Sequence, residues 1–166
     1  MIDTLRDRRR PVNFALFAIC AALLAWAYYL QFAEGLEPCP LCIFQRMAFF
    51  AMAVVFLAAT VHHPRRWGQG VYAVLILAAA GTGVALALRH LYLQSLPADQ
   101  VPACGPGLEY MLNNFPLLET IRTVLEGSGE CAEVDKFWGL TIPAWTLMGY
   151  LSIGGLGILA NLPRRR

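Results

Sequence analysis

The sequence predicts an all-α membrane protein in which four transmembrane helices form a bundle. Of its 166 residues, 58% are apolar and only 14% are charged, which is too hydrophobic for an ordinary soluble core. Four apolar stretches are long enough as helices to cross a hydrocarbon core of about 30 Å. They are residues 14–32, 43–61, 71–88 and 142–162. Residues 1–166 are therefore expected to form a single membrane domain.

The distribution of lysine and arginine predicts how these spans are oriented. Nine of the thirteen basic residues lie in three segments that would share one side of the membrane: residues 6–10, 65–66 and 164–166. Because short cytoplasmic loops carry an excess of basic residues, both termini are expected to be cytoplasmic. The outer side then receives a short first loop, 33–42, and a long second loop, 89–141.

The first apolar stretch could also be a cleaved signal peptide. Basic residues 8–10 precede it, and Ala25-Trp26-Ala27 offers a small-residue cleavage site. However, the apolar run continues beyond that site and includes Tyr28 and Tyr29, which with the tryptophan form an aromatic belt typical of a membrane interface. A retained membrane span is the better interpretation, and cleavage would not change the topology of the other three spans.

In the long outer loop, residues 116–126 are predicted to form a short amphipathic helix. Its apolar residues fall at helical spacing, and Gly127 follows its end. The apolar positions are Leu117, Leu118, Ile121, Val124 and Leu125. The segment is too short to span a bilayer, so it could lie in the membrane interface or pack on the end of the bundle. The sequence favours neither arrangement.

Four of the five cysteines lie in the predicted outer segments. Cys39-Pro40-Leu41-Cys42 is a C-x-x-C motif at the start of the second span, where proline suits the first turn of a helix. Cys104 and Cys131 form a looser pair in the long loop, while Cys20 lies inside a span as a packed thiol. Paired cysteines on an oxidising outer face are expected to form disulfides. A C-x-x-C ring constrains little chain, so disulfide exchange is a better interpretation than a structural staple.

Disulfide exchange requires a thiolate, and two features of the sequence would stabilise one at Cys42. The helix N-terminus carries partial positive charge, and Arg46 lies one turn deeper on the same helix face. An arginine within a membrane span indicates a functional site by default, although it could instead extend to the lipid headgroups. His90 ends the third span at the same membrane level. Such a histidine is most often an interfacial anchor, but its level makes it a candidate site residue.

Several segments of the chain together are similar to those of a known family. They are Cys39-Pro40-Leu41-Cys42-Ile43-Phe44-Gln45-Arg46, Gly129-Glu130-Cys131-Ala132-Glu133, Trp138-Gly139-Leu140 and Pro143-Ala144-Trp145, together with Cys104. In combination they resemble the bacterial disulfide bond formation protein B (DsbB) family over nearly the whole chain. The resemblance implies a protein-disulfide-forming thiol:quinone oxidoreductase of the bacterial inner membrane. Its redox loops would be periplasmic, and it would reoxidise a thioredoxin-like periplasmic partner of the DsbA type.

The resemblance also implies an order of events among the four outer cysteines. The partner's thiolate would attack the Cys104–Cys131 disulfide, and Cys104 would form the mixed disulfide. Cys131 would then attack Cys39, and electrons would reach Cys42. All four cysteines are thus expected to be catalytic.

A membrane quinone, either ubiquinone or menaquinone, is the cofactor that the resemblance implies. Cys42 would face the quinone, Arg46 would help to bind and polarise it, and His90 would lie near its ring. The quinone would pass the electrons on to the respiratory chain. No role follows for Cys20, and neither a metal nor a nucleic acid is expected.

Three other functions compete with this interpretation. The four outer cysteines could hold zinc, but one pair is widely separated in sequence and the compartment is oxidising. A transporter or channel is disfavoured because the spans contain few polar groups besides Gln45 and Arg46. A four-helix quinone reductase of the vitamin K epoxide reductase type stays open, because the sequence does not reveal the direction of the reaction.

Overall fold

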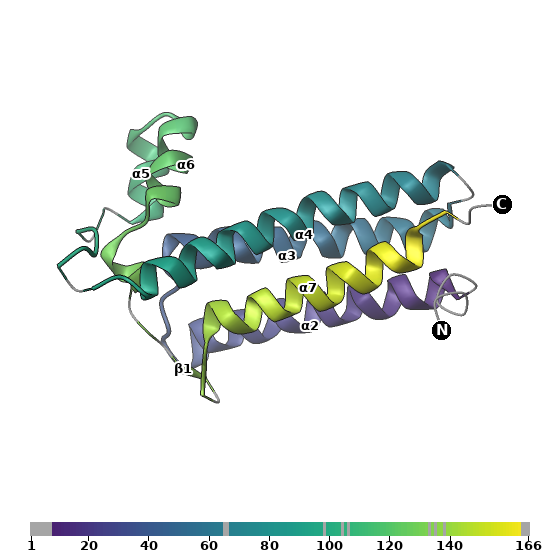
Figure 1. Cartoon of the computed structure of the whole chain (residues 1–166), viewed down its shortest axis with the longest axis horizontal. Coiled ribbons are helices and arrows are strands. Elements are labelled where there is room, and N and C mark those ends of the chain that lie inside the picture. The colour runs from purple at the N-terminus through teal and green to yellow at the C-terminus, as the bar shows by residue number, and fades with distance from the viewer. Residues whose placement is uncertain are drawn as a thin grey trace.

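Four long helices run side by side and make up the body of the computed structural model (Figure 1). The structure describes residues 8–64, 67–97, 99–103, 105, 107–132, 134, 136–137 and 139–163, with the Lys136 side chain left out. The long helices are α2 (Arg9–Ala33), α3 (Pro40–His62), α4 (Trp67–Gln94) and α7 (Ile142–Asn161). Each is long and apolar enough to cross a membrane. The predicted all-α membrane fold with four spans is therefore confirmed.

The start of α3 depends on the same residues that carry the C-x-x-C motif. Cys39 is the N-cap residue in an extended conformation, and its sulfur accepts a hydrogen bond from the Cys42 backbone N–H at 3.4 Å. Pro40 follows in the first turn, where a missing N–H removes no helical hydrogen bond. The cysteine pair consequently lies on the first turn of a long helix, as the sequence predicts.

Close packing inside the bundle depends on glycines that face aromatic rings. Tyr150 of α7 is buried and stacks on Phe49 of α3, with the ring centroids 4.1 Å apart. The Tyr150 ring also lies against Gly83 of α4, where a Cβ atom would overlap it. Gly157 leaves room for Phe56 in the same way. Small residues of this kind let membrane helices approach closely without a hydrophobic driving force.

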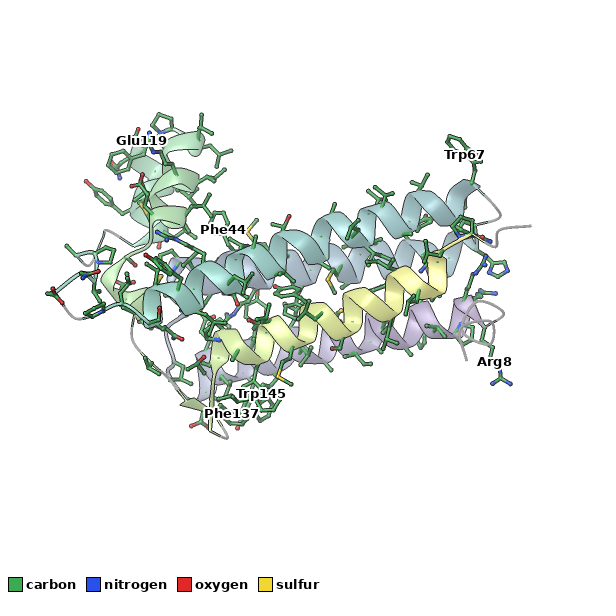
Figure 2. All side chains as sticks on the ribbon, viewed as in Figure 1. Arg8, Phe44, Trp67, Glu119, Phe137 and Trp145 are labelled. Carbon is green, nitrogen blue, oxygen red and sulfur yellow. The ribbon has the colours of Figure 1, made fainter. Side chains whose placement is uncertain are left out.

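Asn13 and Asn161 join the first and last long helices at the end of the bundle away from the cysteines. Asn161 Nδ2 donates to Asn13 Oδ1 at 2.8 Å, and Asn13 Nδ2 donates back to Asn161 Oδ1 at 3.3 Å. Both side chains are buried. Figure 2 shows Arg8 and Trp67 at this end and Phe137 and Trp145 at the other. The start of α2, the turn before α4 and the end of α7 therefore share one end of the molecule.

The long segment between α4 and α7 contains short helices and a two-stranded hairpin. The elements are α5 (Leu108–Asn114), α6 (Leu117–Glu126), the 3-10 helix η1 (Gly129–Ala132), β1 (Lys136–Phe137) and β2 (Leu140–Thr141). The strands pair antiparallel, with Lys136 opposite Thr141 and Phe137 opposite Leu140. Trp145 Nε1 donates to the Phe137 carbonyl at 2.9 Å and so ties this hairpin to α7.

Helix α6 confirms the predicted short helix to within one residue, and Figure 1 shows it with α5 projecting from the cysteine end of the bundle. Arg89 of α4 caps its C-terminus by donating to the Leu125 and Glu126 carbonyls at 2.8 and 2.9 Å. Val124 is buried against the bundle, whereas Leu117 and Leu118 are 67% and 80% exposed. The helix thus packs on the end of the bundle and still presents apolar side chains outward.

Candidate functional site

The two cysteines of the C-x-x-C motif form the centre of the candidate site. Their sulfurs are 3.1 Å apart, and both residues are free thiols. This separation is longer than a disulfide bond of about 2.05 Å, but a small movement of either sulfur would bring the pair to bonding distance. Cys39 is 9% exposed and Cys42 is half-buried. The pair is therefore arranged for reversible disulfide formation at the edge of the bundle.

His90 of α4 lies against both sulfurs. Its Nε2 is 3.9 Å from Cys39 Sγ, and its Nδ1 is 4.0 Å from Cys42 Sγ. The side chain is only 3% exposed, so it points into the bundle and is not an exposed interfacial anchor. An imidazole in this position can take a proton from either thiol or return one.

A polar network behind His90 links three of the long helices. Gln45 of α3 is 2% exposed, and its Nε2 lies 3.1 Å from His90 Nδ1. Thr146 of α7 donates its hydroxyl to Gln45 Oε1 at 2.6 Å. Tyr150, also on α7, donates to the Gln45 backbone carbonyl at 2.5 Å. These contacts orient the imidazole toward the cysteines.

Gln45 and Thr146 were not among the site residues predicted from the sequence. Gln45 is one of the few polar residues in the spans, and this rarity could have marked it as a site residue. Its position on the helix alone does not reveal a partner on α4. Thr146 carried no signal, because threonine commonly donates to the carbonyl of a preceding turn, as it also does here to Pro143 at 3.0 Å.

Arg46 contacts α2 with its guanidinium group. Nη1 donates to Gln31 Oε1, Nη2 donates to the Ala27 carbonyl at 3.2 Å, and the group lies 5.3 Å from the centroid of the Tyr28 ring. Arg46 also interacts electrostatically with Cys42. The structure therefore provides the cation that the sequence suggests near Cys42, but α2 holds it, and its hydrogen bonds are to Gln31 and Ala27.

Cys131 of η1 connects the long loop to the C-x-x-C pair. Its thiol shares a hydrogen bond with Cys39, which together with burial raises the pKa of Cys131 above the ordinary value, while Ser128 opposes the shift. Ser128 Oγ lies 3.6 Å from Cys131 Sγ, and the Cys131 N–H donates to the Ser128 carbonyl at 2.9 Å. The structure thus brings three of the four predicted catalytic cysteines together. The fourth, Cys104, lies outside the described residues.

This arrangement can support a series of disulfide exchanges. Cys131 shares a buried cluster with Cys39, whose sulfur is 3.1 Å from that of Cys42, so a disulfide can pass along the three cysteines with movements of their side chains. Exchange depends on the attacking thiolate, the leaving thiol and access between them. His90 contacts the two sulfurs of the C-x-x-C pair and can serve both as they gain or lose a proton.

Comparison with known proteins identifies the family. Residues 9–160 match the family model described as disulfide bond formation protein DsbB. A relative called Disulfide bond formation protein B from Nitrosococcus oceani is 55% identical over 150 residues, covering 90% of this chain and 89% of the relative. Relatives of the same name from Hahella chejuensis and Methylococcus capsulatus are 51% and 52% identical, over 95% and 86% of this chain and 96% and 88% of their own lengths. The chain therefore belongs to the disulfide bond formation protein B (DsbB) family of membrane proteins.

Proposed function

We propose that this protein is a thiol:quinone oxidoreductase that reoxidises a periplasmic thioredoxin-like dithiol of the DsbA type. The observation that carries the proposal is the place of Cys131 in one buried cluster with Cys39, against which Cys42 packs. The Cys131 and Cys39 thiols interact, and the Cys39 and Cys42 sulfurs are 3.1 Å apart. A cysteine of a long loop, suited to meeting a protein, is thereby linked to a pair at the start of a membrane helix. Family membership supports a role in disulfide bond formation.

The proposed exchange begins at the loop pair. The partner's thiolate bonds to Cys104, breaks the Cys104–Cys131 disulfide and releases Cys131 as a thiolate. Cys131 then bonds to Cys39, which breaks the Cys39–Cys42 disulfide and releases Cys42. The partner's second thiol displaces Cys104, and Cys104 recovers its bond to Cys131 by displacing Cys39. Two electrons have then moved from the partner to the Cys39–Cys42 dithiol.

The residues around this dithiol suit a membrane quinone as the electron acceptor. When bound, a quinone accepts two electrons and two protons and becomes a hydroquinone. Arg46 offers a cation beside an aromatic ring, Tyr28, at the outer level of the bundle, and this pairing suits a flat ring with carbonyl oxygens. His90 would accept one thiol proton at a time at its free ring nitrogen and would pass it to the acceptor before taking the second. Cys42, the more exposed of the two thiols, would face the acceptor.

The proposed location places the cysteine end in the periplasm and both termini in the cytoplasm of a bacterial inner membrane. The excess of arginine in residues 6–10, 65–66 and 164–166 supports this orientation. The exposed Leu117 and Leu118 on α6 would lie in the periplasmic interface of the inner membrane and hold the loop near the lipid.

A turnover assay in detergent tests the proposal. The reduced thioredoxin-like partner, ubiquinone or menaquinone and the purified protein are mixed, and loss of partner thiols is followed together with quinone absorbance. We expect two thiols to disappear for each quinone reduced, and we expect Cys42→Ser to abolish turnover. Cys20→Ser, a buried thiol away from the site, is the matched control and should retain turnover. Full turnover by Cys42→Ser would overturn the proposed terminal step, and oxidation of hydroquinone with reduction of the partner would reverse the direction.

A further inference from the structure

The start of α3 gathers a set of metal-binding side chains. Cys39, Cys42 and His90 offer two sulfurs and one imidazole nitrogen that all lie within 4.8 Å of one another. The sulfurs are 3.1 Å apart, and His90 Nε2 is 3.9 Å from Cys39 Sγ. Thiolate sulfur and imidazole nitrogen are the donors that zinc and similar thiophilic cations prefer.

The observed spacing is close to what a tetrahedral cation requires. Zinc lies about 2.3 Å from sulfur and about 2.0 to 2.1 Å from nitrogen, so its ligand atoms are roughly 3.5 to 3.8 Å apart. The sulfurs of Cys39 and Cys42 would separate slightly, and His90 Nε2 would approach Cys39 slightly. Side-chain rotations on the first turn of α3 are sufficient for both changes, because Cys39 and Cys42 share that turn.

Cys131 supplies a fourth donor from the long loop. It is fully buried in the same cluster as Cys39, and the two thiols interact. Its sulfur is not among the ligand atoms that lie within 4.8 Å of one another, so it must move toward them. With Cys131 added, three cysteines and one histidine make a common ligand set of closed zinc sites. This set differs from the four outer cysteines considered above, because His90 takes the place of Cys104.

The surroundings of His90 are those of a metal-binding histidine. A ligating imidazole usually makes a hydrogen bond through its second ring nitrogen, which sets the orientation of the ring. His90 Nδ1 lies 3.1 Å from the Gln45 amide, which has both a donor and an acceptor. Thr146 Oγ1 lies 2.6 Å from the Gln45 amide and 3.0 Å from the Pro143 carbonyl. Its hydroxyl can donate to the amide oxygen, or it can accept from the amide nitrogen when the amide is turned over and donate to Pro143 instead.

We propose that the reduced protein binds one thiophilic divalent cation, such as zinc, through Cys39, Cys42, Cys131 and His90. Each cysteine thiol releases its proton to solvent as it becomes a ligand. A disulfide that includes any of the three cysteines removes at least one of the ligands, so the complete site exists only in the reduced chain. The ion in turn withholds the sulfurs from exchange and stops turnover. This last consequence, unlike the binding itself, rests on the proposed function.

Cobalt(II) is the probe for binding, because its visible absorption reports tetrahedral sulfur coordination. The full-length protein in detergent is reduced anaerobically with a phosphine, freed of excess reductant and titrated with cobalt(II). We expect tetrahedral bands that saturate at one ion per chain and disappear on addition of zinc. The same protein oxidised beforehand should give none. Absence of the bands from the reduced protein, or their presence in the oxidised protein, would overturn the proposal.

Variants distinguish this site from adventitious binding to thiols. His90→Gln should weaken cobalt affinity at least about 100-fold, more than the 10- to 100-fold typical of a residue that only supports a ligand. His62→Gln, on the exposed end of α3, is the matched control and should bind normally. Cys131→Ser should weaken binding and reduce the sulfur-to-cobalt absorption, whereas Cys20→Ser should change neither. Unchanged affinity in His90→Gln or Cys131→Ser would remove that residue from the site.

A variant with all ligands intact guards against effects on folding. Thr146→Val should weaken cobalt binding about 10-fold through the loss of its contact with Gln45. Thr82→Val removes a similar hydroxyl from an exposed position on α4 and should have no effect. Equal affinities in these two variants would show that the network behind His90 does not support the metal site.

The consequence for turnover is tested separately from binding. Turnover in buffer with a chelator tests the proposed function alone, and the cobalt titration requires no quinone. Adding zinc to the reduced enzyme should inhibit turnover at least about 10-fold, and excess chelator should restore it. Binding without inhibition would overturn the regulatory consequence, while absence of turnover in chelator would count against the proposed function and leave the metal site standing.

Discussion

The two ends of the helical bundle each contain buried amide side chains, and their partners differ. At the end away from the cysteines, Asn13 and Asn161 hydrogen-bond to each other and so hold two helices together. At the cysteine end, Gln45 contacts Thr146 and His90, whose ring faces two thiols. In this protein the buried amide at the candidate site contacts a side chain that can gain or lose a proton, whereas the amides at the other end contact each other.

Removing the imidazole of His90 is expected to have the largest effect on the rate of turnover. His90→Gln takes away the ring that contacts both sulfurs, so turnover of partner thiols should fall by about 100-fold, the lower part of the range for loss of an acid–base group. His62→Gln provides the control and should turn over at the normal rate. Initial rates at saturating partner and quinone measure the difference, and equal rates in the two variants would contradict an acid–base role for His90.

Replacing one amide at each end of the bundle by leucine tests the difference between the two ends directly. Gln45→Leu should lower turnover by about 10-fold, because the imidazole loses a contact comparable to one hydrogen bond. Asn161→Leu should leave turnover unchanged and lower the free energy of unfolding by about 1 kcal/mol, since Asn13 loses its buried partner. Both quantities are measured for both variants in the same detergent. The comparison fails if Gln45→Leu changes stability alone or if Asn161→Leu changes the rate.

The smallest expected effect is a shift in the pH profile of one thiol. The hydrogen bond with Cys39, and then burial, raise the pKa of Cys131, so it stays protonated where an ordinary cysteine, with a pKa of about 8.5, is half-ionised. Only the thiolate is alkylated, so the alkylation rate of Cys131 in the reduced protein should rise at higher pH than that of a short cysteine peptide. Cys39→Ala removes the largest cause and should move the rise to lower pH. Mass mapping of alkylated peptides measures the profile, and coincidence with the free peptide would contradict the shift.

Most of the fold could be predicted because the membrane imposes a simple rule on sequence. Long apolar stretches must become helices, so the four spans were found, although helices such as α4 extend beyond the apolar stretch at 71–88. The short elements α5 and η1 and the β-hairpin of 136–141 were not predicted. They are too short for a periodic pattern, and contacts with other elements stabilise them.

The candidate site could be predicted only where its residues share one helix. Cys39, Cys42 and Arg46 follow each other along α3, so their spacing revealed their proximity. The membrane level of His90 was evident, but the direction of its side chain was not, because that depends on how α4 is rotated in the bundle. The contact of Cys131 with Cys39 joins a loop to a helix, and the sequence suggested it only through family resemblance. The partners of Arg46 on α2 were not predicted, because the contact depends on how α2 packs against α3.

Cys39 is both a proposed redox residue and the N-cap of α3, so a change in its bonding would affect the first turn of that helix. Its sulfur accepts a hydrogen bond from the Cys42 N–H, so the atom proposed to change bonds during exchange also caps the N-terminus of the helix. If forming a bond to Cys131 draws that sulfur away from the helix, the Cys42 N–H must find another acceptor or the first turn must loosen. The proposed exchange would thus be coupled to fraying of the N-terminus of α3, and the order of that first turn would depend on the redox state of Cys39.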